Sequence, residues 1–184
     1  MTKFKREHVR AGGVAIYEKA SILTMATPLT LEKLSEQNDP ILLEAEKYGD
    51  ICIADIQIDG LNTALICIYL SPNTTIKLAK AFIVRNLYYY RSKDNPIIVT
   101  GDFNVDISKE ENTGFVEFLK FFLDLDLVSD SKQPTTLGGS CIDMVFARNC
   151  PESSTKRFIT YFSYHRPLFT SFSSVCIFYM FEHN

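Results

Sequence analysis

The sequence predicts an α+β domain in which two β-sheets pack against each other and helices cover the outside. The first observation is that many short apolar segments with strand-like alternation accompany two amphipathic helical segments. The second is a length of 184 residues with 46% hydrophobic and 12% aromatic residues, which is enough for a substantial core. The sequence contains no repeat, low-complexity tract or linker, so a single domain is expected.

Strands are predicted where apolar and β-branched residues gather between turn signals. Residues 51–58 and 62–69 flank Asp59-Gly60, a dipeptide typical of a two-residue hairpin. Residues 96–100 form a continuous apolar run that indicates a buried strand. Further strands are expected at residues 13–17, 22–26, 142–147, 158–162 and 168–178.

Two helices are predicted from apolar residues spaced three and four apart. Within residues 76–90 the apolar face is formed by Ile76, Ala79, Ile83, Leu87 and Tyr90. Within residues 113–125 it is formed by Phe115, Phe118, Leu119, Phe122 and Leu123. Residues 29–48 are a polar, acidic connection with some helical character. Each helix is therefore expected to lay one apolar face on a sheet.

Composition limits the class of function. The net charge is −3, so no global basic field attracts nucleic acid, although residues 1–20 carry five Lys or Arg and two Glu. The cysteines are odd in number and lack metal-ligand spacing, which indicates small hydrophobes in a reducing compartment: Cys52, Cys67, Cys141, Cys150 and Cys176. No apolar signal region or membrane-spanning run is found, so an intracellular protein is expected.

The most informative segment is Pro-Ile-Ile-Val-Thr-Gly-Asp-Phe-Asn-Val, residues 96–105. It reads as a buried strand that ends in Asp102 and Asn104, which share one face because they lie two residues apart. A carboxylate beside a carboxamide suits a metal or phosphate site, whereas in an Asx turn both side chains would only cap backbone groups. Asp143 in another apolar strand and His165 at a strand end add an acid–histidine pair.

The order of four short motifs resembles the endonuclease/exonuclease/phosphatase superfamily. The motifs are Tyr69-Leu70-Ser71-Pro72-Asn73, Gly101-Asp102-Phe103-Asn104, Pro134-Thr135 followed by Ile142-Asp143, and Ser163-Tyr164-His165. They look most similar to the apurinic-like endonuclease domains of non-LTR retrotransposons and Helitron-type elements, as does the opening Gly12-Gly13-Val14-Ala15-Ile16-Tyr17. The resemblance covers roughly residues 11–175. It implies a four-layer αββα sandwich, the DNase I-like fold, with the active site at one end.

The resemblance also implies metal-assisted hydrolysis of a phosphodiester, with Mg²⁺ as the cofactor and the DNA phosphate backbone as the partner. It implies catalytic roles for Asp102, Asn104, Asp143, His165 and Tyr69, and substrate contacts for Thr135, Ser163 and Asn73. Asp143 and His165 would form a pair at the scissile phosphate, and Asp102 would activate the nucleophile or serve the leaving group. Asn104 would orient the phosphate and Tyr69 would donate to it. Thr136 is equally available in place of Thr135.

Two departures from the pattern are expected to weaken activity. The related endonucleases usually read Ser-Asp-His where this chain has Tyr164, a neutral donor at pH 7 that cannot replace the charge of a carboxylate. The family also begins with strands that end in Asn and in a metal-binding acid, and residues 1–10, interpreted as a basic tail, hold neither. We therefore expect residues 11–184 to form a domain that lacks its first strands and its main metal ligand.

Three functions follow from these observations. The leading one is the endonuclease domain of a mobile element, an incomplete and weakly active or inactive copy that nicks DNA in the nucleus beside reverse transcriptase or helicase domains. An alternative is a phosphatase or phosphodiesterase of the same superfamily that acts on inositol phosphates, lipids or RNA tails. A non-catalytic remnant that serves as a binding or structural module is the third, and Tyr164 favours it.

Overall fold

The computed structural model describes residues 2–4, 14–16, 27–28, 40–58, 60–150, 153–160, 163–172 and 175–179. The strand predicted at 22–26 lies outside these ranges, as do Gly12, Gly13 and Tyr17. The helical character predicted for residues 29–39 lies outside them as well. Among the helices that are described, none has both the length and the apolar character needed to cross a membrane.

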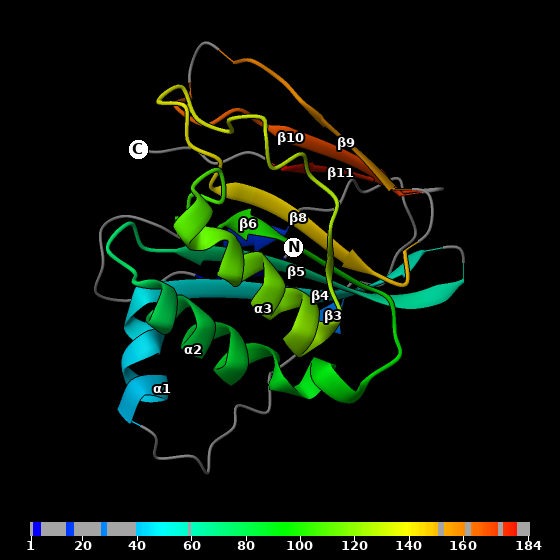
Figure 1. Ribbon diagram of the computed structural model, residues 1–184. Helices are drawn as coiled ribbons and strands as arrows, with labels where there is room; N and C mark the ends of the chain where they lie inside the picture. The colour runs from blue at the N-terminus through cyan, green and yellow to red at the C-terminus, as the bar shows by residue number, and fades with distance from the viewer. Residues whose placement is uncertain are drawn as a thin grey trace.

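A six-stranded sheet forms the centre of the molecule (Figure 1). Its strands lie in the order β3 (Thr27–Pro28), β4 (Gly49–Ile58), β5 (Leu61–Leu70), β6 (Ile97–Asp102), β8 (Asp143–Arg148) and β7 (Asp126–Leu127). β4 and β5 form the predicted antiparallel hairpin. β5 and β6 are parallel, and β8 returns antiparallel beside β6. The carboxyl ends of β5 and β6 therefore meet at the same edge of the sheet.

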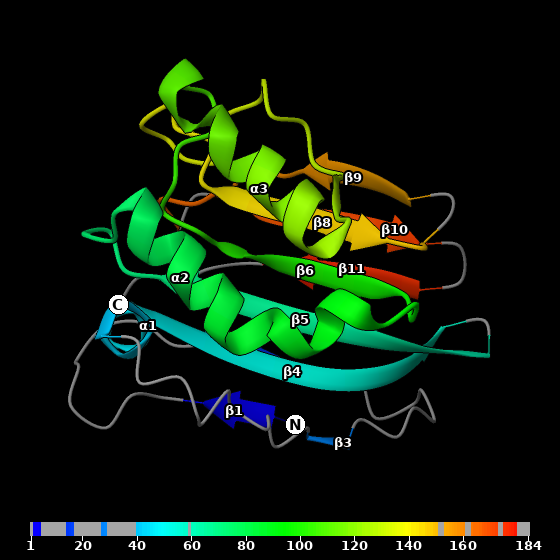
Figure 2. The same ribbon diagram turned by 60° about the horizontal axis from the view of Figure 1, so that its bottom comes forward.

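Helices cover one face of this sheet (Figure 2). They are α1 (Pro40–Ala45), α2 (Ile76–Leu87) and α3 (Thr113–Leu123), with the 3₁₀ turns η1 (Glu46–Tyr48), η2 (Tyr88–Ser92) and η3 (Glu110–Asn112). The predicted apolar faces are confirmed, because Ala79, Ile83, Leu87, Tyr90, Phe115, Leu119, Phe122 and Leu123 are buried. Ile76 and Phe118 are partly buried against the same core.

The other face of the central sheet packs against a second sheet. This sheet has the order β11 (Val175–Tyr179), β10 (Leu168–Phe172) and β9 (Ser153–Arg157), with antiparallel neighbours. Leu168 and Phe172 join an apolar cluster with Leu65, Ile98, Val145 and Ala147 of the central sheet. Two packed sheets with helices outside are thus confirmed; no helix on the outer face of the second sheet is among the residues that the structure describes.

Two small strands lie near the central sheet. β1 (Thr2–Phe4) and β2 (Val14–Ile16) pair with each other and pack near β4.

Two predictions about the C-terminal part of the chain were wrong. Residues 158–160, the described part of the strand expected at 158–162, form no strand, and residues 161–162 lie outside the described ranges. The strand of this region is β9, which is rich in Ser and Thr and has no apolar run to reveal it. The single strand expected at 168–178 is a hairpin of β10 and β11, because antiparallel pairing requires the chain to reverse between them.

Arg148, at the end of β8, ties the helix layer to the sheet at the edge opposite the site described below. The residue is buried. Its Nη1 donates to the carbonyl oxygens of Tyr90 (3.2 Å) and Leu123 (2.9 Å), and its Nη2 donates to those of Lys93 and Asn95. One guanidinium therefore satisfies carbonyls from η2, from the end of α3 and from the turn before β6.

Gly101 is required where β6 approaches β5. A Cβ atom at this position would overlap the backbone carbonyl oxygen of Ile68, the residue paired with it across the two strands. Backbone atoms in a central sheet have no room to move aside, so we predict that Gly101→Ala lowers the free energy of unfolding by several kcal/mol. Urea denaturation measures this change.

The matched control for that substitution is Gly114→Ala. A Cβ atom at Gly114, in the first turn of α3, would meet no atom within 4 Å. Alanine is favoured over glycine within a helix by about 0.8–1.0 kcal/mol, so Gly114→Ala should leave stability unchanged or raise it. Equal effects of the two substitutions would contradict the close approach of β5 and β6.

Candidate active site

A row of polar residues crosses the central sheet at the edge where β5 and β6 end. The strand register places Asp50 opposite Tyr69, Tyr69 opposite Asp102, and Asp102 opposite Asp143. All four residues are buried. Residues directly opposite one another share a face of the sheet, and Tyr69 and Asp143 lie on the same side as Leu65 and Val145, which contact the second sheet. The row therefore faces the space between the two sheets.

Asp50 is the member of this row that sequence reasoning missed. It lies at the start of β4, next to Gly49, and its exposed fraction is 1%. The Asp59-Gly60 turn offered a signal, because Ile58 pairs with Leu61 and counting back along both strands brings Asp50 opposite Tyr69. Hairpin register therefore identifies a third buried carboxylate beside the motif residues.

Asp102 and Asn104 form an Asx turn, the alternative predicted for this motif. Oδ1 of Asp102 accepts the backbone N–H of Asn104 at 2.9 Å, and Asn104 has a left-handed backbone with φ of 49°. Nδ2 of Asn104 donates to the carbonyl oxygen of Leu70 at 2.6 Å. The turn thus fixes Asp102 and holds the end of β5 beside it.

The second carboxylate oxygen of Asp102 is free of this turn. Oδ2 is buried and accepts no hydrogen bond from the described residues. It lies 3.9 Å from Nε2 of His165, which is too long for a hydrogen bond. This oxygen is the part of Asp102 that is left to act on another group.

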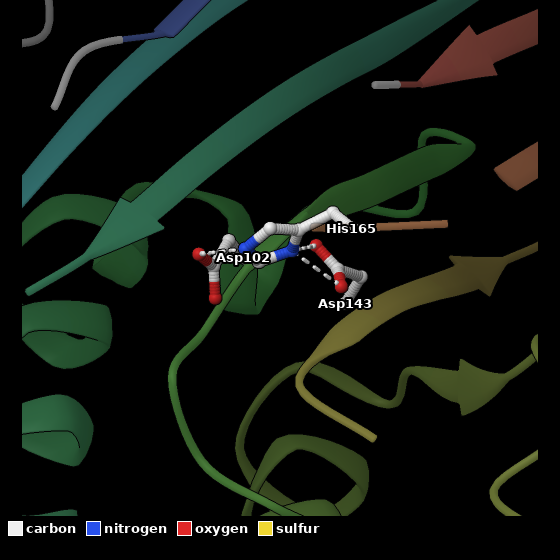
Figure 3. A group of neighbouring side chains, drawn as sticks. All are labelled: Asp102, Asp143 and His165. Atoms are coloured by element: carbon white, nitrogen blue, oxygen red, sulfur yellow. Dashed lines mark hydrogen bonds and ion pairs between the residues drawn. The ribbon is translucent and has the colours of Figure 1, made fainter. Parts of the chain in front are cut away.

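His165 lies between the two carboxylates (Figure 3). Its Nδ1 is 3.0 Å from Oδ1 and 2.9 Å from Oδ2 of Asp143, while its Nε2 faces Asp102. The carboxylate of Asp143 determines the tautomer of His165, because it accepts a hydrogen bond and so keeps a proton on Nδ1. Nε2 is then the nitrogen that can take or give a proton.

Thr135 positions both members of this pair. Its hydroxyl oxygen accepts the backbone N–H groups of Ile142 (3.1 Å) and Asp143 (3.0 Å), and its carbonyl oxygen accepts the backbone N–H of Arg166 at 2.7 Å. Thr136 instead pairs with His165 in an isolated bridge, and its hydroxyl bonds Ser140. The Thr135 oxygen, predicted as a substrate contact, is occupied by backbone groups in this structure.

The remaining predicted site residues differ in how they are connected to this centre. Oγ of Ser163 accepts the backbone N–H of His165 at 3.1 Å, so it shapes the turn that presents the imidazole. Asn73 is exposed in the turn after β5, and no described hydrogen bond or ion pair joins it to the carboxylates. Tyr69 belongs to the row itself, beside Asp102.

The buried charges shift the pKa values of the cluster. Burial raises the pKa of Asp102 to about 7, and the charge of Asp143 adds to this, while His165 and Asn104 partly offset it. Burial by itself lowers the pKa of His165, but the hydrogen bond to Asp143 and the charges of Asp143 and Asp102 raise it overall. Asp102 therefore changes protonation near neutral pH, as a general base requires.

The cluster fits a divalent cation. Asp102, Asp143 and His165 each bring one ligand atom within 4.8 Å of the others. The oxygen without a hydrogen bond, Oδ2 of Asp102, is a hard ligand whose burial is costly unless it is satisfied. Both oxygens of Asp143 already face Nδ1 of His165. Asp102 would thus be the principal ligand, in keeping with Mg²⁺ sites that use one or two carboxylates.

Comparison with solved structures identifies the fold. The endonuclease domain of TRAS1, a telomere-specific non-LTR retrotransposon, is similar with a TM-score of 0.53 and 16% identity, over 65% of this chain and 59% of that one. An endonuclease/exonuclease/phosphatase family protein from Leptotrichia buccalis C-1013-b has a TM-score of 0.50 and 14% identity, over 71% and 54%. The chain has the fold of the endonuclease/exonuclease/phosphatase superfamily.

The likeness is one of structure. The sequence matches no protein-family model and no curated protein. The chain spans less than two thirds of the length of both superfamily structures named above. The fold predicted from the four motifs is confirmed by the similarity to these solved structures.

Position 164 is where this example of the superfamily fold departs from the resembled motif. Tyr164 is 49% exposed and its ring lies edge-on to that of His165, with centroids 5.8 Å apart. Tyr164 is therefore not packed into the core. The ring of Tyr164 lies beside the imidazole of His165. The carboxylates of the cluster are therefore those of Asp102 and Asp143.

Substitution of Thr135 tests how the candidate site is held together. We predict that Thr135→Val lowers the free energy of unfolding, because the buried N–H groups of Ile142 and Asp143 lose their acceptor, at about 1–3 kcal/mol for each group. Thermal unfolding measures the loss. Thr135→Ser keeps the oxygen and is the control; if Val and Ser variants melt alike, the hydroxyl does not position Asp143.

Asp102→Asn should change stability in a pH-dependent way. A carboxyl whose pKa rises from 3.8 to about 7 on folding binds more protons in the folded state, so wild-type stability falls as pH rises through this range. His165, whose pKa is also raised, acts in the same direction. We predict that Asp102→Asn stabilises the chain at pH 8 by up to about 4 kcal/mol and has little effect near pH 4.

Urea denaturation at both pH values measures this difference. Asp126→Asn is the matched control, because Asp126 is an exposed carboxylate that pairs with Lys120 on the surface. A stability change that is the same at pH 4 and pH 8 would contradict the raised pKa of Asp102.

Proposed function

We propose that this chain is a divalent-metal-dependent phosphodiesterase that nicks DNA, as an endonuclease domain of a mobile element. The observation that supports this most is the buried group of Asp102, His165 and Asp143 on a superfamily fold. The similarity to the TRAS1 endonuclease domain, a retrotransposon protein, favours DNA over other phosphoesters. The substrate is then the DNA phosphate backbone.

His165 and Asp143 act together on the phosphate. Asp143 accepts a hydrogen bond from Nδ1–H of His165, fixes the ring and stabilises the imidazolium. Nε2 is left to hold a proton at the scissile phosphate, where it can donate to an oxygen as negative charge develops. The raised pKa of His165 favours the protonated imidazole.

Asp102 prepares the nucleophile. Its pKa of about 7 allows the carboxylate to accept a proton from water at neutral pH, and Oδ2 is the oxygen that remains available to do so. In the metal-bound state Oδ2 of Asp102 would be the Mg²⁺ ligand, and the cation would neutralise phosphate charge and lower the pKa of a bound water in place of proton transfer to Asp102. Asn104 keeps Oδ1 of Asp102 occupied, so the carboxylate presents Oδ2 in a fixed direction.

The other motif residues have supporting roles in this proposal. Tyr69, next to Asp102 in the row, donates a hydrogen bond from its hydroxyl to a phosphate oxygen. Asn73, in its exposed turn, contacts the DNA strand. Ser163 and Thr135 act by positioning His165 and Asp143 and border the bound phosphate. A reverse transcriptase or helicase domain acting on the same DNA, and a nuclear location, follow from a mobile-element role.

The rate expected of this chain is low. The resembled endonucleases carry an Asp where this chain has Tyr164, and the loss of one charged group that stabilises a phosphoryl transition state costs on the order of a hundredfold. Residual nicking by Asp102, Asp143 and His165 is still expected above the uncatalysed background.

Nicking of supercoiled plasmid DNA by the 184-residue chain tests the proposal. We expect slow, Mg²⁺-dependent conversion to the open circle that EDTA stops and that His165→Ala or Asp143→Asn lowers at least about a hundredfold. Asp126→Asn removes an exposed carboxylate and should retain the wild-type rate.

The same preparations distinguish the alternatives. Release of inorganic phosphate from small phosphomonoesters without DNA nicking would replace the endonuclease with a phosphatase. Nicking that is equally fast in wild type and His165→Ala would come from a contaminant and would contradict the proposed site. Absence of hydrolysis of any phosphoester would leave the chain as a binding or structural module.

A further inference from the structure

The ring of Tyr164 stands beside the candidate active site with much of its surface open to solvent. The side chain is 49% exposed, and the ring meets that of His165 edge-on at an interplanar angle of 76°. The neighbouring residues, Ser163 and His165, are bound into the site by the Ser163 hydroxyl and by Asp143. The backbone that carries the ring is thus fixed on both sides.

A loop on the other side supports the same ring. The backbone N–H of Leu137 donates to the carbonyl oxygen of Tyr164 at 3.0 Å. A Cβ atom on Gly138 would overlap the Tyr164 hydroxyl, so the phenol end lies directly on this glycine. Leu137 itself is 57% exposed. Tyr164 and Leu137 are thus exposed residues joined by a backbone hydrogen bond next to a buried and charged site, and we name this pair the Tyr164 rim.

We propose that the Tyr164 rim is a stacking platform for an unpaired nucleobase attached to the phosphodiester that His165 contacts. This rests on the proposed function and narrows its substrate to DNA with an unstacked base at the cleavage position. A nucleotide joins a planar aromatic base to its phosphate through one sugar, and the rim offers a planar ring beside the imidazole, with the two ring centroids 5.8 Å apart. Base–aromatic stacking tolerates any sequence, because every base has a π-face.

The chemistry of the rim favours a base over other occupants. Tyrosine combines a large apolar face with low conformational entropy, and a neutral phenol does not repel a nearby phosphate as a carboxylate would. The ring is already held by His165 and Gly138, so little ordering is needed when a base stacks on it. Small phosphoesters without an aromatic group would gain nothing from this surface.

Binding of single-stranded oligonucleotides in EDTA tests the inference without any cleavage. The probe carries 2-aminopurine at one position and a fluorescein label at its end, and the matched probe has an abasic site at every position. For wild type we expect quenching of 2-aminopurine and clearly tighter binding of the base-bearing probe. Tyr164→Ala should weaken that binding about 10- to 100-fold and leave the abasic probe unchanged, whereas Tyr164→Phe should bind as wild type does.

Gly138→Ala provides a second variant that keeps the tyrosine. The added methyl group would overlap the phenol oxygen and push the ring out of place, so this variant should weaken base-dependent binding in the same direction as Tyr164→Ala. It also carries the test if Tyr164→Ala fails to fold. Equal affinity of wild type for the two probes, or loss of base-dependent binding in Tyr164→Phe, would overturn the inference.

The results that would reject the stacking platform differ from those that would reject the proposed nuclease function. Nicking abolished by His165→Ala together with unchanged binding by Tyr164→Ala would keep the nuclease and reject the platform. Base-dependent binding that requires Tyr164 in a chain that never nicks DNA would keep the platform and reject the nuclease. A chain that binds neither probe contradicts the platform.

Discussion

The register of the central sheet is the constraint on which both the core and the candidate site depend. Asp102 pairs with Tyr69 on one side and Asp143 on the other, and this places all three on the face toward the second sheet. The alternate residues of the same strands, such as Val99, fill the core beneath the helices. A slip of one residue would exchange these faces and bury the carboxylates under α2 and α3.

The electrostatic cost of the site follows from that placement. Three ionisable groups, Asp102, Asp143 and His165, lie between two sheets where water is largely excluded, and two of them carry like charge when ionised. The imidazole between the carboxylates compensates part of this, and a divalent cation at Asp102 would compensate more. Burial therefore makes the Asp102 carboxylate bind either a proton or a divalent cation more favourably, so a proton and a cation would compete for Asp102.

Much of this could be predicted from sequence, because local signals and global fold agree there. The Asp59-Gly60 turn fixed a hairpin, and the spacing of apolar residues located the helices. The resemblance carried by the four motifs predicted that Asp102, Asp143 and His165 meet at one end of the fold, and the structure has these three side chains together.

The parts that sequence could not supply depend on long-range pairing. The segment that forms β9 is polar, and its strand conformation is held by pairing with β10. The hydroxyl groups of Thr155 and Thr170 also form a hydrogen bond between the two strands. Thr135 is another example, since a threonine beside a proline gives no sign that its hydroxyl will accept two N–H groups from a strand that begins several residues later. Such contacts are set by tertiary structure.

The bonds of Arg148 have a consequence for how the molecule opens. A single guanidinium holds carbonyls of η2, of α3 and of the turn before β6, so none of these segments can separate alone without leaving a buried charge partly unsatisfied. Local opening of this end should therefore be cooperative, with amide hydrogen exchange in the three segments occurring at a common rate.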